Sequence, residues 1–224
     1  ELNSETDFVA KNQKFIDLLA VIGEICVAVD AKCEKCVLAA SHNGQTGEEI
    51  IVAATAVIGE KLSLRRVTRI EKAEDEVFGV YKHNGGKIVV LSVIKGSDEL
   101  VAKDVCMHVA AMNPKFLSKE FVDQAYLASE TEIIRSEALN ENAKAAKPKP
   151  EAIIEKMVEG RVNKMLKEIC LVDQPFVKNP DETVGQYVKN HASEIVLYVR
   201  LGVGEGIEKR KDDFVAEVMA AVNK

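Results

Sequence analysis

A proline-containing break near the middle of the chain constrains the fold more than any other feature of the sequence. Residues 143–150 read Ala-Lys-Ala-Ala-Lys-Pro-Lys-Pro, and a proline inside a helix removes a hydrogen bond and clashes with the preceding turn. Charged stretches on both sides of this break carry apolar residues at helical spacing. These residues are Val122, Tyr126, Ile133 and Leu139 before the break, and Ile154, Met157, Val158, Val162, Met165, Leu166 and Ile169 after it. Narrow apolar seams on two polar helices predict an antiparallel coiled-coil arm over residues 117–173 that projects from the body.

The segments before the arm alternate between helical and strand patterns. Asn84-Gly85-Gly86 is the clearest local signal, because consecutive positive φ angles are what a tight hairpin turn requires. The expected elements are a helix with Phe15, Leu18, Leu19, Ile22, Ile25 and Cys26 on one face, a loop at 40–48, a helix at 48–57, a strand at 62–70, a hairpin of 77–83 with 87–94, and a helix at 97–112.

The segments after the arm continue the same mixture. A helix is expected at 183–191 and a strand at 195–201, followed by a glycine-rich turn at 202–206. A last helix at 207–224 carries its apolar residues on one face, namely Phe214, Val215, Val218, Met219 and Val222.

A faint internal repeat organises these elements. Residues 60–67 resemble residues 193–200, and each lies at the end of a similar helix-and-strand order. The chain is therefore predicted to be an α+β protein with two related subdomains, each a small antiparallel sheet with helices. The expected boundaries are 1–75 for the first subdomain, with its first strand missing, and 76–116 with 174–206 for the second.

Composition narrows the function classes. The formal net charge is −6, aromatic residues make up 5% of the chain and there is no Trp, which together disfavour a nucleic-acid binder. The chain has no run of about 18 consecutive apolar residues, which a membrane-spanning helix would need. The five cysteines are odd in number, which favours a reducing compartment without structural disulfides. The chain does not start with Met, so it is expected to begin inside a longer parent sequence.

Cys33-Glu34-Lys35-Cys36 is the most specific chemical motif. A zinc site needs four ligands, and His42 is the only further candidate nearby. A redox site needs a thiol with a lowered pKa, usually where a helix opens after a strand. Because the motif follows a helical pattern, we expect two cysteines on a helical turn or in a loop, and a thiol enzyme stays an alternative.

No other motif points to catalysis. The loop at 202–206 joins a strand to a helix, but it lacks the Gly-Lys-Ser/Thr signature of a phosphate loop and no later strand completes a βαβ unit. His42, His83, His108 and His191 are far apart in the sequence. We therefore expect neither an enzyme nor a bound metal or cofactor.

The segment Glu5-Thr6-Asp7-Phe8-Val9-Ala10-Lys11 places an acidic and an aromatic residue together at a helix start. From the residues alone, a helix cap followed by a core Phe is the commoner arrangement. A protruding corner that binds a partner is the alternative.

Residues 1–11 resemble the signature of the elongation factor Ts family at all eleven positions. Further similar segments follow in the family's order along essentially the whole chain. They are Ile58-Gly59-Glu60 with Arg65-Arg66, Met107 to Pro114, Lys149-Pro150-Glu151, Met157 to Arg161, Gln174 to Val177, and Val203 to Glu208.

The resemblance implies guanine nucleotide exchange on elongation factor Tu during translation, with Asp7 and Phe8 entering the GTPase domain near its magnesium site. It also implies that Val9 supports this corner, that Ile58 and Gly59 lie near the same contact, and that Met107 and His108 face a second domain of the partner. A cytoplasmic protein is expected, with an organellar origin left open. An interaction scaffold without exchange activity is the alternative function, and association of two copies is left open.

Departures from the family pattern lie at the start of the chain. The family's N-terminal helical domain and first core strand have no counterpart among the residues present, so full exchange activity of this chain is not implied.

Overall fold

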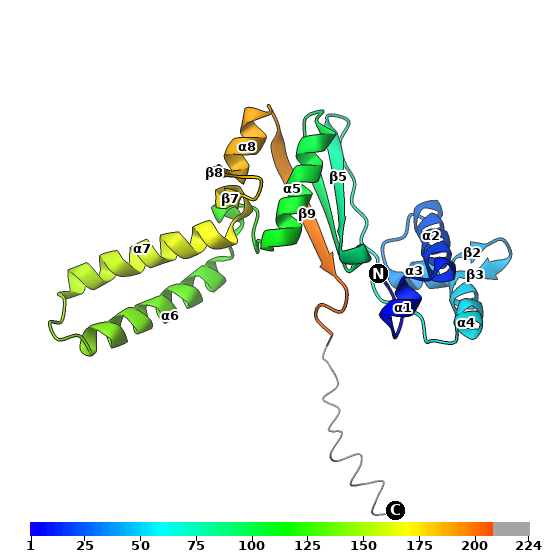
Figure 1. The fold of residues 1–224 in the computed structure, drawn as a ribbon, viewed down its shortest axis with the longest axis horizontal. Helices are drawn as coiled ribbons and strands as arrows, with labels where there is room; N and C mark the ends of the chain where they lie inside the picture. Colours follow the sequence, from blue (N-terminus) through cyan, green and yellow to red (C-terminus); the bar gives the residue numbers. More distant parts are fainter. Residues whose placement is uncertain (208–224) are drawn as a thin grey trace, which may run out of the picture.

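The structure is a computed structural model that describes residues 1–207. The C-terminal helix expected over 207–224 therefore lies outside the described residues, except for Ile207. A small helical part, a central sheet with its helix, and a long two-helix arm follow one another across the molecule (Figure 1). The first 207 residues contain no helix that is both long and apolar enough to span a membrane.

Three helices pack together in the helical part. On α2, four apolar residues at helical spacing, Phe15, Leu18, Ile22 and Ile25, are buried against α3 and α4. A capping box between Thr46 and Glu49 starts α4, and Gly59 with φ of 84° ends it. The elements are β1 (Leu2–Asn3), α1 (Asp7–Ala10), α2 (Gln13–Ala28), α3 (Glu34–Ala39), β2 (Ser41–His42), β3 (Gln45–Thr46), α4 (Gly47–Ile58) and β4 (Ser63–Leu64).

Two expectations for this part are corrected. The loop predicted at 40–48 contains a small hairpin, because β2 pairs with β3 before α4 begins. The strand predicted over 62–70 is only β4, Ser63–Leu64. Its antiparallel partner β1 is two residues long, and the ladder ends where the Arg65 N–H donates to the carbonyl oxygen of Glu1. Alternating side chains alone cannot extend a strand beyond its partner.

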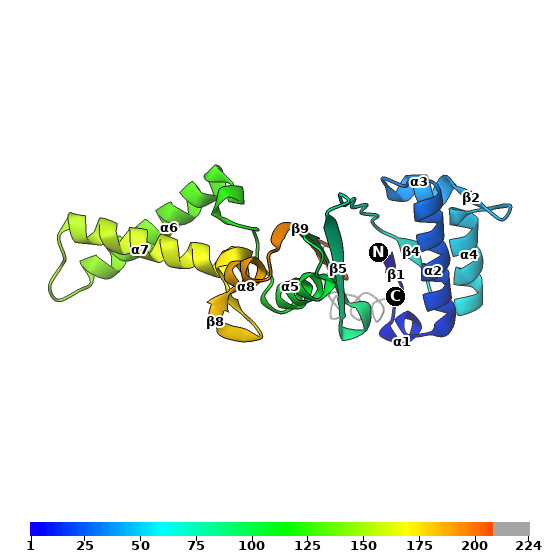
Figure 2. The same cartoon turned by 90° about the horizontal axis from the view of Figure 1, so that it is seen from above.

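The central sheet has three antiparallel strands in the order β5-β6-β9. These are β5 (Glu76–His83), β6 (Ile88–Lys95) and β9 (Glu194–Gly202). Asn84, Gly85 and Gly86 all have positive φ, so the hairpin predicted from these residues is confirmed. One face of the sheet is covered by α5 (Glu99–Met112) (Figure 2).

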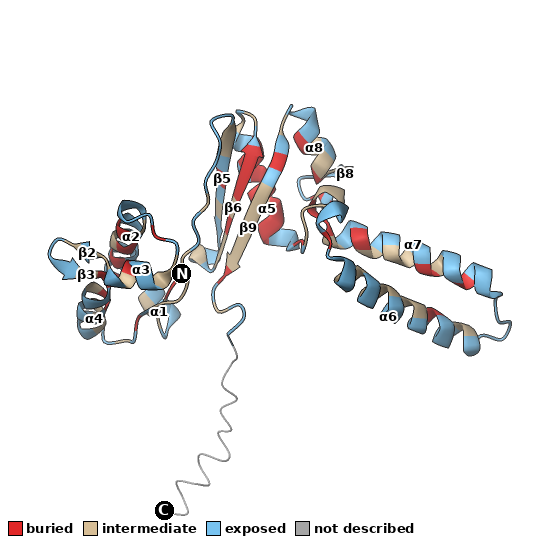
Figure 3. Cartoon of the chain, turned by 180° about the vertical axis from the view of Figure 1, so that it is seen from behind, coloured by how far each residue is buried: buried red, intermediate tan, exposed pale blue. Residues whose placement is uncertain are grey.

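A close approach of α5 to the sheet depends on Gly79. A Cβ at this position would lie 2.3 Å from the backbone carbonyl of Ala102. The core beneath α5 includes Val90, Ile94 and Val105, all 0% exposed. Figure 3 shows this concentration of buried residues on β6 and α5, in contrast to the exposed arm.

The arm consists of α6 (Gln124–Ala143) and α7 (Glu151–Ile169), and the proline-containing segment forms its tip. Ala138, Ile154 and Val158 are buried between the two helices. Arg135 reaches Glu155 at 2.8 Å across the seam. The two-helix hairpin predicted from the sequence is present, while supercoiling of its helices stays a prediction.

The chain returns from the arm to the sheet through short elements. These are the 3-10 turn Leu171–Asp173, β7 (Pro175–Phe176), β8 (Asn179–Thr183) and α8 (Val184–Asn190). β7 pairs with β8, and Thr183 caps α8 in a capping box with Gln186. Phe176 is buried and stacks on Tyr187, with ring centroids 4.2 Å apart. These contacts fix the base of the arm beside α5.

Candidate functional site

The Asp7-Phe8 segment forms an exposed corner. α1 is a single helical turn whose N-cap is Thr6, and the Thr6 hydroxyl accepts a hydrogen bond from the Val9 N–H. Asp7 lies in the first turn, where a carboxylate is favoured by the exposed amide ends of a helix. The Phe8 side chain is 84% exposed. Of the two alternatives that the sequence leaves open, the core Phe is therefore wrong.

One carboxylate braces this corner from a distant segment. Glu60 Oε2 accepts hydrogen bonds from the N–H of Thr6 at 2.9 Å and of Glu5 at 3.2 Å. The Thr6 hydroxyl donates to Glu60 Oε1 at 2.6 Å. A charged acceptor makes such hydrogen bonds stronger than neutral ones. The start of α1 is thus tied to the second residue after the end of α4.

The same arrangement brings Ile58 and Gly59 toward the corner. Ile58 is the last residue of α4, and Gly59 adopts a left-handed conformation that turns the chain toward Glu60. Ile58 and Val9 are both partly buried and pack against the same apolar core. The structure therefore brings together Asp7, Phe8, Val9, Ile58 and Gly59, which belong to two separate segments of the sequence.

The electrostatics of the corner are simple. The Asp7 carboxylate pairs with Lys11 Nζ at 3.3 Å, and both side chains are at least half exposed. Solvent-exposed pairs one helical turn apart contribute only about 0.3–0.5 kcal/mol. A partner that offers a stronger cation can therefore take the Asp7 carboxylate at little cost.

Met107 and His108 lie apart from this corner. Both are on α5, in the central part of the molecule (Figure 1). The Met107 side chain is partly exposed. His108 is 0% exposed, so the expectation that its side chain faces another protein does not agree with its position in this structure.

His108 instead belongs to a buried polar chain. Its Nδ1 accepts a hydrogen bond from the Val177 N–H at 3.2 Å, so its proton lies on Nε2, which donates to Gln174 Oε1 at 2.9 Å. Gln174 Nε2 then donates to the carbonyl oxygen of Glu168 at 2.6 Å. Burial lowers the pKa of His108, and the Gln174 hydrogen bond opposes this only in part. The chain connects α5 to the last turn of α7.

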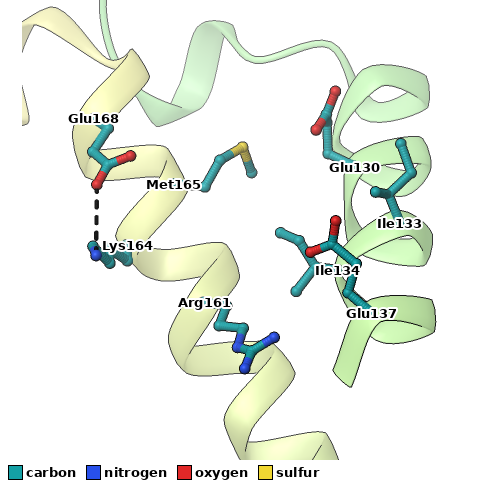
Figure 4. Close-up of a pocket in the computed structure, with 8 residues that line it drawn as sticks. All are labelled: Glu130, Ile133, Ile134, Glu137, Arg161, Lys164, Met165 and Glu168. Atoms are coloured by element: carbon teal, nitrogen blue, oxygen red, sulfur yellow. Dashed lines mark ion pairs between the residues drawn. The ribbon is translucent and has the colours of Figure 1, made fainter. Parts of the chain in front are cut away.

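An open cleft lies between the two helices of the arm (Figure 4). Its volume is about 330 Å³, and Ile133, Ile134 and Met165 line it together with charged residues of both signs. Lys164 pairs with Glu168 at 3.9 Å, and Arg161 with Glu141 at 2.6 Å. Glu130 and Glu137 also line the cleft, without an ion-pair partner among the described residues. The lining contains no Ser, Cys or His side chain and no helix start that could hold a phosphate, so it gives no specific signal for catalysis.

Metal ligands do not converge in the described part of the chain. Within residues 1–207, His, Cys, Asp and Glu side chains form no group of three that could hold a metal ion. Cys33 and Cys36 are adjacent, with their sulfurs 2.7 Å apart, and the pair lies beyond the far end of α2 from the corner.

The sequence does not reveal the role of two residues. In the sequence Glu60 appears only as a member of a motif, because its hydrogen bonds to the corner join residues 54 and 55 positions apart. Gln174 likewise appears there only as a member of a motif, and its hydrogen-bond partner His108 is not evident because it lies 66 residues away. The signals that could have found them are a carboxylate directly after a helix-ending glycine and a Gln-Pro pair after the arm.

An exposed aromatic residue beside a carboxylate, on a corner held by a second segment, is the kind of feature that interfaces between proteins use, so the geometry favours the class of protein-binding factors over that of enzymes. Comparisons with known proteins agree with this class. The profile of the family described as Elongation factor TS matches residues 5–205. A curated relative from Acholeplasma laidlawii (strain PG-8A), named Elongation factor Ts, is 49% identical over 225 residues, which cover all of this chain and 75% of the relative. The chain belongs to the elongation factor Ts family, whose members are nucleotide exchange factors in translation elongation and not catalytic enzymes.

Proposed function

We propose that this chain binds elongation factor Tu and promotes release of its GDP by inserting the Asp7-Phe8 corner near the magnesium and phosphate site. One observation carries the proposal: Phe8 is 84% exposed on a turn that Glu60 holds in place. Family membership supplies the partner. The corner supplies a rigid apolar wedge next to a negative charge.

Phe8 provides the favourable free energy of insertion. Burying one Phe side chain in an apolar cleft yields about 2 kcal/mol. This free energy is still available for binding, because the Phe8 side chain is exposed in the chain by itself. If the partner must open to accept the ring, the free energy of burying Phe8 offsets the cost of separating the elements that hold the nucleotide. Each 1.4 kcal/mol by which the GDP-bound state is destabilised relative to the transition state for GDP release raises the release rate about tenfold.

Asp7 acts on the ion that holds the diphosphate. GDP is bound through backbone amides around its phosphates and through Mg²⁺, which offsets their charge. A carboxylate brought close to this ion competes for its water ligands. The weak pairing of Asp7 with Lys11 leaves the carboxylate available for this role.

Val9, Ile58 and Gly59 hold the corner at a defined angle. Val9 anchors α1, and Ile58 anchors the end of α4, to the core of the helical part, while Gly59 turns the chain so that Glu60 reaches Thr6. An immobile wedge loses less conformational entropy on binding than a flexible one. We therefore assign these three residues to the same partner contact as Asp7 and Phe8.

A second contact with another domain of the partner is proposed around α5 and the arm. Met107 is partly exposed and can contact the partner directly. His108 is buried, so its role is to hold α5 against the base of α7 through Gln174. The arm, proposed to be a coiled coil, extends the surface of the protein beyond this junction.

Hydrophobic clusters support the proposed division of the chain into subdomains. One cluster lies within residues 2–67, one surrounds α5 within 77–198 and also includes Leu117, Leu171 and Val172 at the base of the arm, and two lie between residues 116 and 170. Separate cores are what independent subdomains require. We propose boundaries at 1–75, at 76–116 with 174–206, and at 117–173 for the arm.

Exchange needs no covalent step by this chain. Coupling between two ligands is reciprocal, so a factor that weakens GDP binding must itself bind the nucleotide-free partner more tightly than the GDP-bound partner. The proposal therefore predicts tighter association with nucleotide-free elongation factor Tu.

The direct test measures release of a fluorescent GDP analogue from elongation factor Tu with and without this chain. Exchange is expected to accelerate in proportion to the concentration of the chain until it saturates. Binding without acceleration would favour the alternative, an interaction scaffold with a helical arm. Absence of both binding and acceleration would exclude the proposal.

A further inference from the structure

Cys33 and Cys36 bring two thiols within reach of a covalent bond. Their sulfurs are 2.7 Å apart, whereas the sulfurs of a disulfide are about 2.05 Å apart. Cys33 is the N-cap of α3 and Cys36 lies in its first turn. Ala31, two residues before Cys33, and Val37, directly after Cys36, are buried. The backbone is therefore held on both sides, and the two sulfurs need to approach each other by only about 0.65 Å to bond.

The other three cysteines lack this combination of access and a neighbour. Cys106 and Cys170 are buried and Cys26 is half-buried, while Cys36 is exposed. Burial raises the pKa of the Cys106 thiol to about 11 and also raises those of Cys26 and Cys170. The hydrogen bond with Cys33 lowers the pKa of Cys36. A thiolate is the nucleophile in thiol–disulfide exchange, so Cys36 is the first cysteine to react.

A metal does not account for the pair. Structural zinc sites use four protein ligands and catalytic ones use at least three. The described residues bring no third His, Cys, Asp or Glu into a group with these two cysteines. The pair is therefore suited to two-electron chemistry between its own sulfurs.

We propose that Cys33 and Cys36 form a reversible dithiol–disulfide site that exchanges with small-molecule disulfides such as glutathione disulfide. The Cys36 thiolate attacks one sulfur of the disulfide, the bond between the two glutathione sulfurs breaks, and one glutathione thiolate leaves. Cys33 then loses its proton to water and attacks Cys36 Sγ, which expels the second glutathione thiolate. The protein gives up two electrons and two protons, and glutathione disulfide becomes two glutathione molecules.

This site goes beyond the proposed exchange function and is separated from it in space. The cysteine pair follows the C-terminal end of α2, and the Asp7-Phe8 corner precedes its N-terminal end. A helix of 16 residues is about 24 Å long. Oxidation of the pair is therefore expected to leave GDP release unchanged, so the two proposals fail or succeed separately.

The test follows the oxidation state of the full chain by mass. The reduced protein is incubated with an excess of oxidised glutathione, quenched in acid, and then labelled under denaturing conditions with N-ethylmaleimide. Of the five cysteines, the wild-type chain is expected to label at only three and to retain no glutathione. Treatment with dithiothreitol is expected to restore labelling at all five.

Single variants distinguish ring closure from simple modification. Cys33→Ser removes the second nucleophile, so this variant is expected to retain one glutathione on Cys36. Cys26→Ser serves as the matched control and is expected to lose two labels as the wild-type chain does. Circular dichroism checks that each variant is folded. A wild-type chain that labels at all five cysteines, or that retains glutathione on Cys36, would overturn the proposal.

Discussion

The hydroxyl of Thr6 donates a hydrogen bond to Glu60 at 2.6 Å across 54 residues of sequence. This contact makes the orientation of the Asp7-Phe8 corner depend on where α4 ends. Gly59 ends α4 in a left-handed conformation, and Glu60 follows it directly. The corner is therefore a property of two segments, although its exposed residues belong to one.

Glu60→Ala is expected to slow stimulated GDP release while leaving the fold intact. The change removes three hydrogen bonds to residues 5 and 6, and a hydrogen bond in a folded protein typically contributes about 0.5–1.5 kcal/mol to stability. Release kinetics and urea unfolding measured on the same preparation check this. Glu60→Gln keeps an amide oxygen as an acceptor and is expected to lie between the wild type and Glu60→Ala. Unchanged release by Glu60→Ala would show that the brace is not needed.

His108 is expected to make stability depend on pH. Its folded-state pKa is lowered by burial, so the unfolded chain binds a proton at higher pH than the folded chain does. Its contribution is fully present above the unfolded pKa of about 6.5. The contribution is lost as the pH falls from that value through the folded pKa.

The measurement is the free energy of unfolding by urea between pH 7.5 and pH 5. His108→Gln is expected to be less stable at pH 7.5, because buried hydrogen bonds are lost, and to show a shallower slope with pH. The exposed His83, changed to Gln, serves as the matched control. Parallel pH profiles for the wild type and His108→Gln would contradict the buried neutral histidine.

Two glycine-to-alanine changes are expected to act in opposite directions. At Gly79 a Cβ would lie 2.3 Å from the backbone of Ala102, and such overpacking costs about 1–3 kcal/mol. At Gly160, in the middle of α7, a Cβ meets no atom within 4 Å, and alanine is favoured in a helix by about 0.5–1 kcal/mol. Urea unfolding of both variants compares them. Destabilisation of similar size at both positions would contradict the close contact of α5 with β5.

Local signals in the sequence are sufficient to predict several elements. The prolines at 148 and 150 predict the tip of the arm, because proline is excluded from helix interiors. Asn84-Gly85-Gly86 predicts the hairpin, because it needs residues that accept positive φ. Both features depend on residues that are neighbours in the chain, and both are found in the structure.

Long-range partners decide what the sequence does not predict. The strand expected over 62–70 ends early because β1 is short. His108 is buried because Gln174 and the Val177 N–H satisfy both of its ring nitrogens. α5 also buries residues around most of its circumference, including Ala102, Asp104 and Cys106, so its sequence pattern does not distinguish an inward from an outward histidine.

The exposure of Phe8 does not follow from the local sequence alone. A Phe at a helix start more often packs into a core, and only the position of α1 on the surface of the helical part makes it protrude. The resemblance to the elongation factor Ts family favours the corner over the core. The structure agrees with the corner.

Stimulated GDP release by Phe8→Ala tests the central claim most directly. Loss of about 2 kcal/mol of insertion free energy corresponds to roughly thirtyfold slower stimulated release at subsaturating concentrations, with urea unfolding unchanged because Phe8 is exposed. Val27→Ala is the matched control, since Val27 is equally exposed at 84% and lies near the other end of α2. Its release rate is expected to equal that of the wild type. If the Phe8→Ala variant stimulates GDP release as fast as the Val27→Ala variant does, insertion of Phe8 is not what drives release, and the proposed mechanism is contradicted.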